Sequence, residues 1–385
     1  MTATNAAASC AMLDDPVTAD IVRVAPEAVL EGARPRLLDE WQLMPQLWNL
    51  VRRAVDASSE KGQFLLTGSA TPADDVTRHT GAARVMRIQQ RTLTWFEQDG
   101  LPTSTGVSLS DLFDGGVPTP DLSQPLTYSD VLGRLLRPGF PGLRDLPPQR
   151  SQRMLRSYLD DVARVDMPRL IDMRHDPIVM RQLLNSLARS VASEVSYSTL
   201  AADVRQVAPT ITPDTVATYT GVLEQLFVLE PQKAWAPALR SRARLRSSVR
   251  QHLADPALAA AALGASKESL SRDPATVGLL FESAVIHDLR ILSASLEAEV
   301  RHYRDSNGHE IDAVVTLPDG RWGAIEIKLG AGQIGEGRLS LAKAISQIDS
   351  TVVSQPAFRM VVTGTGQTYV CDDGTVTCPL TALRP

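Results

Sequence analysis

The 385-residue sequence lacks several features that would place it in a broad class of proteins at once. No apolar run approaches the length needed to cross a bilayer, and the first dozen residues lack the basic start and long apolar stretch of a signal peptide. Cysteine is scarce: Cys10, Cys371 and Cys378 are odd in number, and only the last two are near each other. They form neither a disulfide framework nor a zinc pattern, so we expect a protein of the reducing cytoplasm with no membrane association.

An excess of basic residues is also missing. The formal net charge of −5 argues against non-specific binding of nucleic acid through overall charge, but leaves room for a local basic patch. The rest of the composition is that of a soluble globular protein, with 43% hydrophobic and 22% charged residues. The length predicts two or three domains, each large enough to bury its own core.

The N-terminal part alternates strand and helix signals, and two of its strands end in polar residues. Residues 36–40 read Arg-Leu-Leu-Asp-Glu, an apolar strand that ends in adjacent carboxylates. Apolar residues near helical spacing predict a helix over 45–57, and the apolar run 64–66 that follows leads into Thr67-Gly68-Ser69. Short apolar runs of this kind are typical of a buried parallel sheet, so the pattern predicts an α/β fold.

These polar strand ends match the Mg²⁺ and water end of a P-loop ATPase. In such proteins a strand-end Asp orders Mg²⁺ and the next Glu polarises the attacking water, which assigns these roles to Asp39 and Glu40. Thr67 or Ser69 would reach between the carboxylates and the γ-phosphate of ATP. Arg84 would contact a nucleotide phosphate, also that of a neighbouring subunit in an oligomer. The alternative is an ordinary surface Asp-Glu pair.

The phosphate cradle of such an ATPase is missing from the sequence. A cradle needs Gly-x-x-x-x-Gly-Lys-Ser/Thr, because backbone N–H groups and the Lys must wrap the β- and γ-phosphates. The first glycine of this chain is Gly32, and no Gly-Lys pair occurs. Residues 2–11 look like the middle of the helix that normally follows the cradle. We therefore expect that the sequence as given begins after the cradle and does not hydrolyse ATP.

The middle of the chain changes character twice. Residues 101–150 are punctuated by proline and predict a connector or lid. From Ser151 the pattern turns helical, and two short helices over 197–203 and 212–226 with a strand at 227–229 resemble a winged helix-turn-helix. No Lys or Arg lies between Gln206 and Gln232, which favours packing against neighbouring elements over reading of DNA bases.

A run of arginines follows this unit. Its alternation would put most of the arginines on one face of a strand, which fits a solvated edge strand. A phosphate-binding face is the alternative. The run consists of Arg240, Arg242, Arg244, Arg246 and Arg250.

A second carboxylate cluster lies near the C-terminus. Strands over 301–304, 311–315 and 322–328 are separated by Ser-Asn-Gly and Pro-Asp-Gly turns. In nuclease cores, an Asp and a Glu on neighbouring strands hold Mg²⁺ through oxygen ligands, here Asp312 and Glu326. Lys328 shares the face of Glu326 and would orient water and stabilise negative charge. Glu282, on the helix predicted over 279–292, would complete the metal site, although alternating charge on an exposed hairpin would give a similar pattern by chance.

Taken together, these segments resemble a family of prokaryotic AAA-type ATPases with a C-terminal domain of unknown function. The resemblance implies ATP and Mg²⁺ as cofactors, and its three domains together with the proline-punctuated segment give four parts. These are a partial AAA-type domain over 1–100, a Pro-rich connector or lid over 101–150, a helical winged-helix domain over 151–235, and a restriction-endonuclease-like α/β domain over 236–385. The motifs that carry the resemblance are Leu13-Asp14-Asp15-Pro16, 38–42, 65–69, the Arg137-to-Gly142 turn, Tyr158-Leu159-Asp160, His252 to Pro256, Phe281-Glu282, Asp312 and 326–328.

Three functions remain open from the sequence. The first is an ATPase-type protein whose nucleotide cycle moves a nucleic-acid- or partner-binding C-terminal half. The second is a metal-dependent nuclease whose N-terminal half has become a scaffold. The third is a non-catalytic interaction protein, for example a component of an immunity or toxin–antitoxin system.

Overall fold

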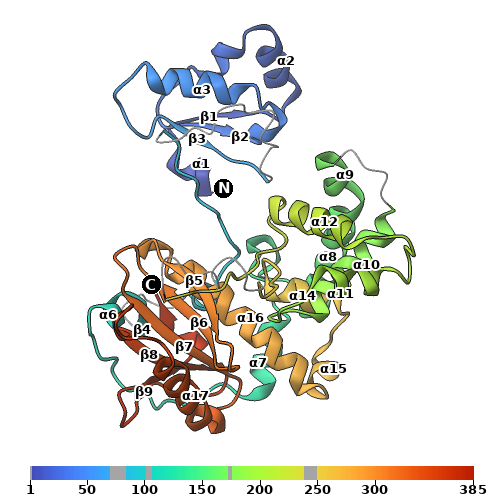
Figure 1. Cartoon of the computed structure of the whole chain (residues 1–385). Coiled ribbons are helices and arrows are strands. Elements are labelled where there is room, and N and C mark those ends of the chain that lie inside the picture. The colour runs from blue at the N-terminus through green and yellow to red at the C-terminus, as the bar shows by residue number, and fades with distance from the viewer. Residues whose placement is uncertain (1, 70–83, 101–105, 172–175, 238–248) are drawn as a thin grey trace. The chain divides into compact units, whose positions relative to one another are not determined.

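The structure is a computed structural model that describes residues 2–69, 84–100, 106–171, 176–237 and 249–385. It confirms a mixed α/β protein with a multi-stranded sheet in the C-terminal region (Figure 1). The chain divides into two compact units. One comprises residues 1–90 with the short segments 166–173 and 221–227, and the other comprises the remainder.

The N-terminal unit is built on a three-stranded parallel sheet in the order β1-β2-β3. Its strands are β1 (Ser9–Met12), β2 (Arg36–Asp39) and β3 (Phe64–Leu66). The predicted helix over 45–57 is confirmed as α3 (Leu47–Asp56), which buries Leu47 and Val51 in the same core cluster as Leu38. Two other α-helices described in this part are α1 (Thr2–Ala6) and α2 (Pro16–Val24).

The prediction of a continuous helix over residues 2–11 is wrong. The helix α1 ends at Ala6, and Ser9–Met12 pair in register with Arg36–Asp39. The backbone hydrogen bonds of these residues are therefore made across the sheet. Asp15, from the first of the resemblance motifs, instead begins α2 by accepting a hydrogen bond from the backbone of Thr18.

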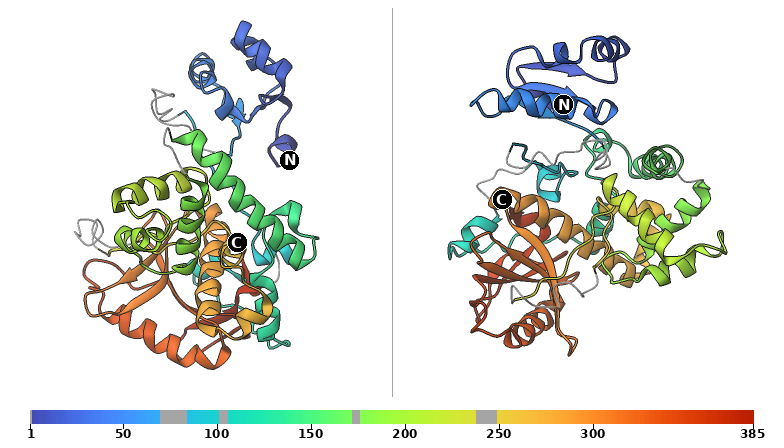
Figure 2. Two further views of the ribbon diagram at one scale, coloured as in Figure 1. Left: turned by 90° about the vertical axis from the view of Figure 1, so that its right-hand side faces the viewer. Right: turned by 45° about the horizontal axis from the view of Figure 1, so that its top comes forward.

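Most of the second unit between residues 91 and 292 is helical. Figure 2 shows the helices of this unit, in colours from cyan through green to orange, beside the orange and red strands of the C-terminal sheet. Among the described residues no helix is both long enough and apolar enough to cross a membrane. The α-helices described between residues 91 and 292 are α5 (Trp95–Asp99), α6 (Leu109–Phe113), α7 (Tyr128–Leu135), α8 (Pro148–Asp161), α9 (Met167–Leu170), α10 (Pro177–Arg189), α11 (Tyr197–Val204), α12 (Pro213–Gln225), α14 (Pro256–Ala262), α15 (Lys267–Ser271) and α16 (Pro274–Leu292). Of these helices, α9 and the end of α12 belong to the segments of the first unit.

A small sheet accompanies three of these helices. The extended segments 191–194 and 229–232 both bridge to segment 250–253, which therefore lies between them. Along the chain the order is α10, segment 191–194, α11, α12, segment 229–232 and segment 250–253. This helix–strand–helix–helix–strand–strand order is that of a winged helix, and extends the two helices and one strand that the sequence indicated.

The C-terminal sheet has six strands in the order β5-β6-β7-β8-β10-β9. Pairing is antiparallel from β5 to β7, parallel from β7 through β8 to β10, and antiparallel between β10 and β9. Helix α17 (Ile334–Ser346) packs on this sheet through Leu341 and Ala344, in one core cluster with Val314 and Ala324. The strands are β5 (Glu299–Arg304), β6 (Glu310–Thr316), β7 (Trp322–Lys328), β8 (Phe358–Thr363), β9 (Tyr369–Val370) and β10 (Val376–Pro379).

The Pro-rich segment is integrated with this C-terminal part. Strand β4 (Val107–Ser108) pairs in parallel with β11 (Leu383–Arg384), and the ring of Phe113 packs edge-on against Phe358 of β8. The sequence predicted a connector or lid here, because the prolines interrupt any long helix. The contacts with β11 and Phe358 come from residues far away in sequence, so the local pattern does not indicate them.

Two motifs of the resemblance meet through one buried carboxylate. Asp255 begins α14 by accepting a hydrogen bond from the backbone N–H of Ala257 (2.8 Å), and its other oxygen accepts one from Gly139 (2.8 Å). Gly139 belongs to the Arg137-to-Gly142 turn, and a Cβ there would lie 2.4 Å from the carbonyl oxygen of Leu93. Asp255 therefore joins the turn to the strand–helix junction that follows the winged-helix sheet.

Candidate functional site

The antiparallel register of β6 and β7 brings together the carboxylates predicted near the C-terminus. Ala313 pairs with Ile325, so Asp312 and Glu326 are the next pair along and share one face of the sheet. Lys328 follows on that face, with its Nζ 3.3 Å from Glu326 Oε1 and 3.2 Å from Glu336 Oε1 on α17.

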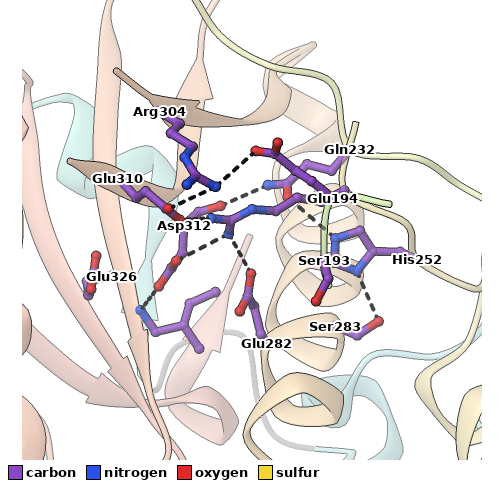
Figure 3. A network of polar contacts seen from close by, with 12 residues as sticks. Ser193, Glu194, Gln232, His252, Glu282, Ser283, Arg304, Glu310, Asp312 and Glu326 are labelled. Carbon is purple, nitrogen blue, oxygen red and sulfur yellow. Dashed lines mark hydrogen bonds and ion pairs between the residues drawn. The ribbon is translucent and has the colours of Figure 1, made fainter. Parts of the chain in front are cut away.

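Glu282 reaches the same place from α16. This helix begins at Pro274 with Asp273 as its N-cap, as expected for a Pro at the first helical position. Its buried residues, including Phe281 and Ser283, fix the rotation of the helix. Glu282 then faces the sheet, and Figure 3 shows its side chain beside that of Asp312.

Arg250 lies at the centre of this cluster. Its Nη1 contacts Glu282 Oε1 at 2.7 Å and Asp312 Oδ1 at 3.3 Å, and its Nη2 forms an ion pair with Glu310. Only 6% of the Arg250 side chain is exposed. Figure 3 shows dashed contacts from one guanidinium group to the three carboxylates, while Glu326 stands beside them without a dashed contact.

Hydrogen bonds from neighbouring groups position the strand and the helix that carry Asp312 and Glu282. The other oxygen of Asp312, Oδ2, accepts a hydrogen bond from the backbone N–H of Ile327 (3.0 Å). Gln232 donates from Nε2 to the carbonyl oxygen of Asp312 (2.9 Å), and its backbone pairs with that of Arg250 in the winged-helix sheet. His252 lies 3.1 Å from the hydroxyl of Ser283 on α16. The winged-helix strands therefore contact β6 through Gln232 and α16 through His252.

The cluster is strongly acidic for a buried place. Burial, and then the charge of Asp312, raise the pKa of Glu282 to about 8, although Arg250 acts in the opposite direction. Burial and Asp312 likewise raise the pKa of Glu326 to about 8, against the effect of Lys328. For Arg250 burial acts to lower the pKa, but Glu282, Asp312 and Glu310 outweigh it and the pKa is raised. The arginine therefore remains charged and compensates neighbouring carboxylates that are only partly exposed to water.

The arrangement does not fit a divalent cation as it stands. Within the described ranges, no three His, Cys, Asp or Glu side chains are grouped so that they could hold a metal ion. The oxygens of Glu282 and Asp312 that would face a cation instead face the guanidinium nitrogen. The oxygen Oε2 of Glu326 is buried and has no hydrogen-bond partner among the described residues, although Lys328 and Ser340 both act to lower the pKa of this carboxyl. Sequence reasoning identified four members of the cluster, but their use as metal ligands remains a prediction.

The N-terminal strand ends also come together. The hydroxyl group of Thr67 donates a hydrogen bond to the carboxylate of Asp39. The side-chain amide of Gln42 donates one hydrogen bond to Glu40 and another, of 3.2 Å, to the hydroxyl of Ser69. Glu40 adopts a left-handed backbone conformation (φ 56°) directly after β2.

Arg84 is placed elsewhere within this unit. It forms an ion pair with Asp56, the last residue of α3. Because α3 starts near the end of β2 and leads back toward the start of β3, Asp56 lies away from Asp39 and Glu40. Contact of Arg84 with a phosphate of a neighbouring subunit stays a prediction.

Sequence reasoning missed the role of Arg250. It grouped Arg250 with the arginine run, of which Arg240, Arg242, Arg244 and Arg246 lie outside the described residues. It also assigned no role in the site to Glu310, Gln232 or His252. Arg250 lies two residues before His252, and His252 is the first residue of one of the motifs that carry the resemblance. This position could have indicated that Arg250 belongs to the site. Alternation along a strand would then have put both residues on one face.

Two family models match the chain, and both describe domains of unknown function. The model of DUF8612 matches residues 129–269, and the model of DUF4143 matches residues 277–383. Neither is an ATPase family. No curated protein matches the chain, and no solved structure does. Arg250 lies in the first matched region and Glu282, Asp312 and Glu326 lie in the second, so the cluster joins the two.

Proposed function

We propose that the second unit is a nucleic-acid-binding module on a restriction-endonuclease-like fold, and that it does not cut nucleic acid while Arg250 occupies the carboxylate cluster. The carrying observation is the three ion pairs of that buried arginine with Glu282, Asp312 and Glu310. They neutralise the side chains that a nuclease would use to hold Mg²⁺. A nuclease-type fold is also used for binding alone, because fold does not fix function.

Two observations favour nucleic acid as the partner. One is the winged-helix order of elements, and the other is the sequence that connects segments 229–232 and 250–253. That connection contains Arg240, Arg242, Arg244 and Arg246. Arginines bind backbone phosphates and require no basic residues on α12, where there are none. A protein partner is the alternative.

Fluorescence polarisation with labelled duplex DNA, single-stranded DNA and RNA tests this proposal over a range of salt concentrations. We expect salt-dependent binding. Replacement of the four arginines by Gln should reduce the slope of log K against log salt by about 0.9 for each duplex phosphate that is no longer neutralised. A matched control replaces Arg150, Arg153, Arg205 and Arg272, four exposed arginines outside the run. Equal reductions in both variants, or no binding by the wild type, would point to a protein partner instead.

A second candidate concerns the N-terminal unit. The hydrogen bond between Thr67 and Asp39 joins the ends of neighbouring parallel strands, as the sensor position of an AAA-type ATPase would require. Domains of the DUF4143 type are commonly found in proteins associated with AAA ATPases. The sequence nevertheless contains no Gly-Lys cradle, so the residues present do not fit a bound triphosphate. We propose an ATPase-like unit that serves as a scaffold in this chain, in the cytoplasm, where its three free cysteines would stay reduced.

Isothermal titration with Mg²⁺-ATP tests the second candidate. We expect no binding in the micromolar range, because Asp39 and Glu40 alone cannot hold the β- and γ-phosphates. Micromolar binding that is abolished in Asp39→Asn would contradict the scaffold and support an ATP site.

A further inference from the structure

A small cavity lies between helices α8 and α10, which contact each other in the second unit (Figure 1). It shares no lining residue with the carboxylate cluster. Asp160, Ala163 and Arg164 line one side, and residues of α10, among them Arg181 and Asn185, line the other. The volume is about 210 Å³, below the roughly 300–1,000 Å³ of pockets for drug-sized ligands. The cavity therefore fits a small ion or a single charged group of a larger molecule.

The backbone on one side of the cavity departs from a regular α-helix. Helix α8 ends at Asp161, and the chain continues as a π-helical turn over Val162–Asp166. Pro168, in the next helix α9, has no N–H group to donate to the carbonyl oxygen of Arg164 four residues earlier, so a regular α-helix cannot continue through this segment. Turns of the π type occur frequently at functional sites, and this one carries Arg164, which lines the cavity.

The positive charge of Arg181 is only weakly compensated. Its Nε lies 3.6 Å from Asp160 Oδ1, and the side chain of Asp160 is 51% exposed. The other end of the guanidinium group, Nη1, is buried and has no hydrogen-bond partner among the described residues. Burial lowers the pKa of Arg181, Asp160 opposes this effect and Arg156 adds to it. The guanidinium group is still charged at neutral pH, so it lies beside a second arginine with one loosely held counter-charge.

Asn185 lies one helical turn after Arg181 and is also unsatisfied. Its Oδ1 is buried and lacks a hydrogen-bond partner in the part of the chain that the structure describes, and a half-turn of the amide places its NH₂ group there instead. Arg189, further along the same helix, shows the usual arrangement, with Nη2 at 2.6 Å from Asp203 Oδ2. Buried polar atoms are normally hydrogen-bonded, so the unsatisfied groups of Arg181 and Asn185 indicate a missing partner, which for a guanidinium group is an anion.

We propose that this cavity binds a phosphate group through the guanidinium group of Arg181, with Arg164 as a second cation and the amide of Asn185 as a further donor. The planar fork of an arginine matches two phosphate oxygens, and Asp160 competes with the phosphate for Arg181. The phosphate is either a free ion or part of a nucleic-acid backbone. The site is independent of Arg250 and of the arginine run, so it stands or falls separately from the proposed function.

Isothermal titration of the full chain with inorganic phosphate, against chloride at matched ionic strength, is the first arm of the test. The wild type should bind phosphate in about the millimolar range. Arg181→Gln should bind at least about 10-fold more weakly, because it loses charge-assisted hydrogen bonds. Asp160→Asn should bind more tightly, because the competing carboxylate is gone. If Arg181 and Asp160 form only a structural ion pair, neither substitution will change the phosphate affinity, and that result would refute a free-phosphate site.

A matched control neutralises another arginine of α10. Arg189 is already paired with Asp203 and its side chain is 63% exposed, so Arg189→Gln should bind phosphate as the wild type does. An equal loss in this variant would show a general effect of net charge and would refute a specific site.

A second variant covers a failure of Arg181→Gln to fold. Arg164 is exposed on the π-helical turn, so Arg164→Gln should fold normally and bind phosphate several-fold more weakly. A folded Arg164→Gln variant with the affinity of the wild type would count against the proposal.

Fluorescence polarisation with labelled duplex DNA is the second arm and identifies the source of the phosphate. A slope of log K against log salt that falls by about 0.9 in Arg181→Gln assigns the site to one backbone phosphate. An unchanged slope together with lost binding of inorganic phosphate assigns it to the free ion. Identical behaviour of the wild type and Arg181→Gln in both arms would overturn the proposal.

Discussion

Asp255 allows the contribution of a single buried side chain to be separated into two measurable parts. One oxygen caps α14 through the N–H of Ala257, and the other accepts from the N–H of Gly139. Asp255→Asn keeps one acceptor oxygen but places an amide donor against a second N–H donor. Asp255→Ala removes both acceptors. The residue is buried, so water cannot replace either hydrogen bond.

The expected decreases in the free energy of unfolding follow from these hydrogen bonds. Leaving one buried N–H unsatisfied costs about 1–3 kcal/mol, which is the decrease we expect for Asp255→Asn. Removal of the helix cap adds about 1 kcal/mol, so Asp255→Ala should be destabilised by roughly 2–4 kcal/mol. The exposed cap Asp273 of α16, which accepts from Thr276, is the control, and Asp273→Ala should cost only about 1 kcal/mol.

Urea unfolding at neutral pH measures these differences from the midpoint, provided that the slope of the transition stays constant. The order of stability should be wild type, then Asp255→Asn, then Asp255→Ala. If Asp255→Ala were destabilised no more than Asp273→Ala, the hydrogen bond between Asp255 and the Gly139 turn would contribute nothing to stability, and the proposed link between the two motifs would be wrong.

Three further predictions concern other buried positions. Burial raises the pKa of the Cys378 thiol to about 12. A thiol reagent at pH 8 should therefore label the exposed Cys10 within minutes but label Cys378 only after unfolding. Equal labelling rates for the two cysteines would contradict the burial of Cys378. Gly323→Ala should destabilise the C-terminal sheet by about 1–3 kcal/mol, because a Cβ would lie 2.2 Å from the ring of Phe358, and an unchanged urea midpoint would show that the ring can move. Burial, then Arg290 and Arg250, lower the pKa of His252 well below 6.5. The unfolded chain therefore takes up a proton at a higher pH than the folded chain, and the free energy of unfolding should fall as the pH drops below about 6.5. The variant His252→Gln should show a smaller fall between about pH 7 and pH 5, and a pH dependence identical to that of the wild type would refute this assignment.

The sequence predicted local structure best where apolar periodicity and turn residues agree. Helix α3 and strands β6 and β7 lie within a few residues of their predicted positions, because their hydrophobic residues follow one period and Pro318-Asp319-Gly320 marks the hairpin. It failed at Ser9–Met12, where pairing with β2 overrides the local helical signal. The Pro-rich segment also could not be placed, because Val107 and Phe113 are held by partners more than two hundred residues away in sequence.

The candidate site was predicted in part for the same reason. Asp312, Glu326 and Lys328 follow from alternation on two neighbouring strands, and Glu282 from its place on the preceding helix. Arg250 could not be assigned, because its contact with Glu282 and Asp312 depends on how the winged-helix sheet packs against α16 and β6. Alternation shows which face a side chain shares, but not which distant element supplies its partner.

In our proposed function, the guanidinium group of Arg250 neutralises Glu282 and Asp312, so that the second unit does not hold Mg²⁺ at these carboxylates and does not cut nucleic acid. The most direct measurement is a crystal structure of the full chain grown with Mn²⁺, with anomalous difference maps calculated at the cluster. We predict the guanidinium group between Glu282 and Asp312 and no anomalous peak there. A Mn²⁺ peak bound by Asp312 and Glu326, with the side chain of Arg250 turned away, would contradict this proposal.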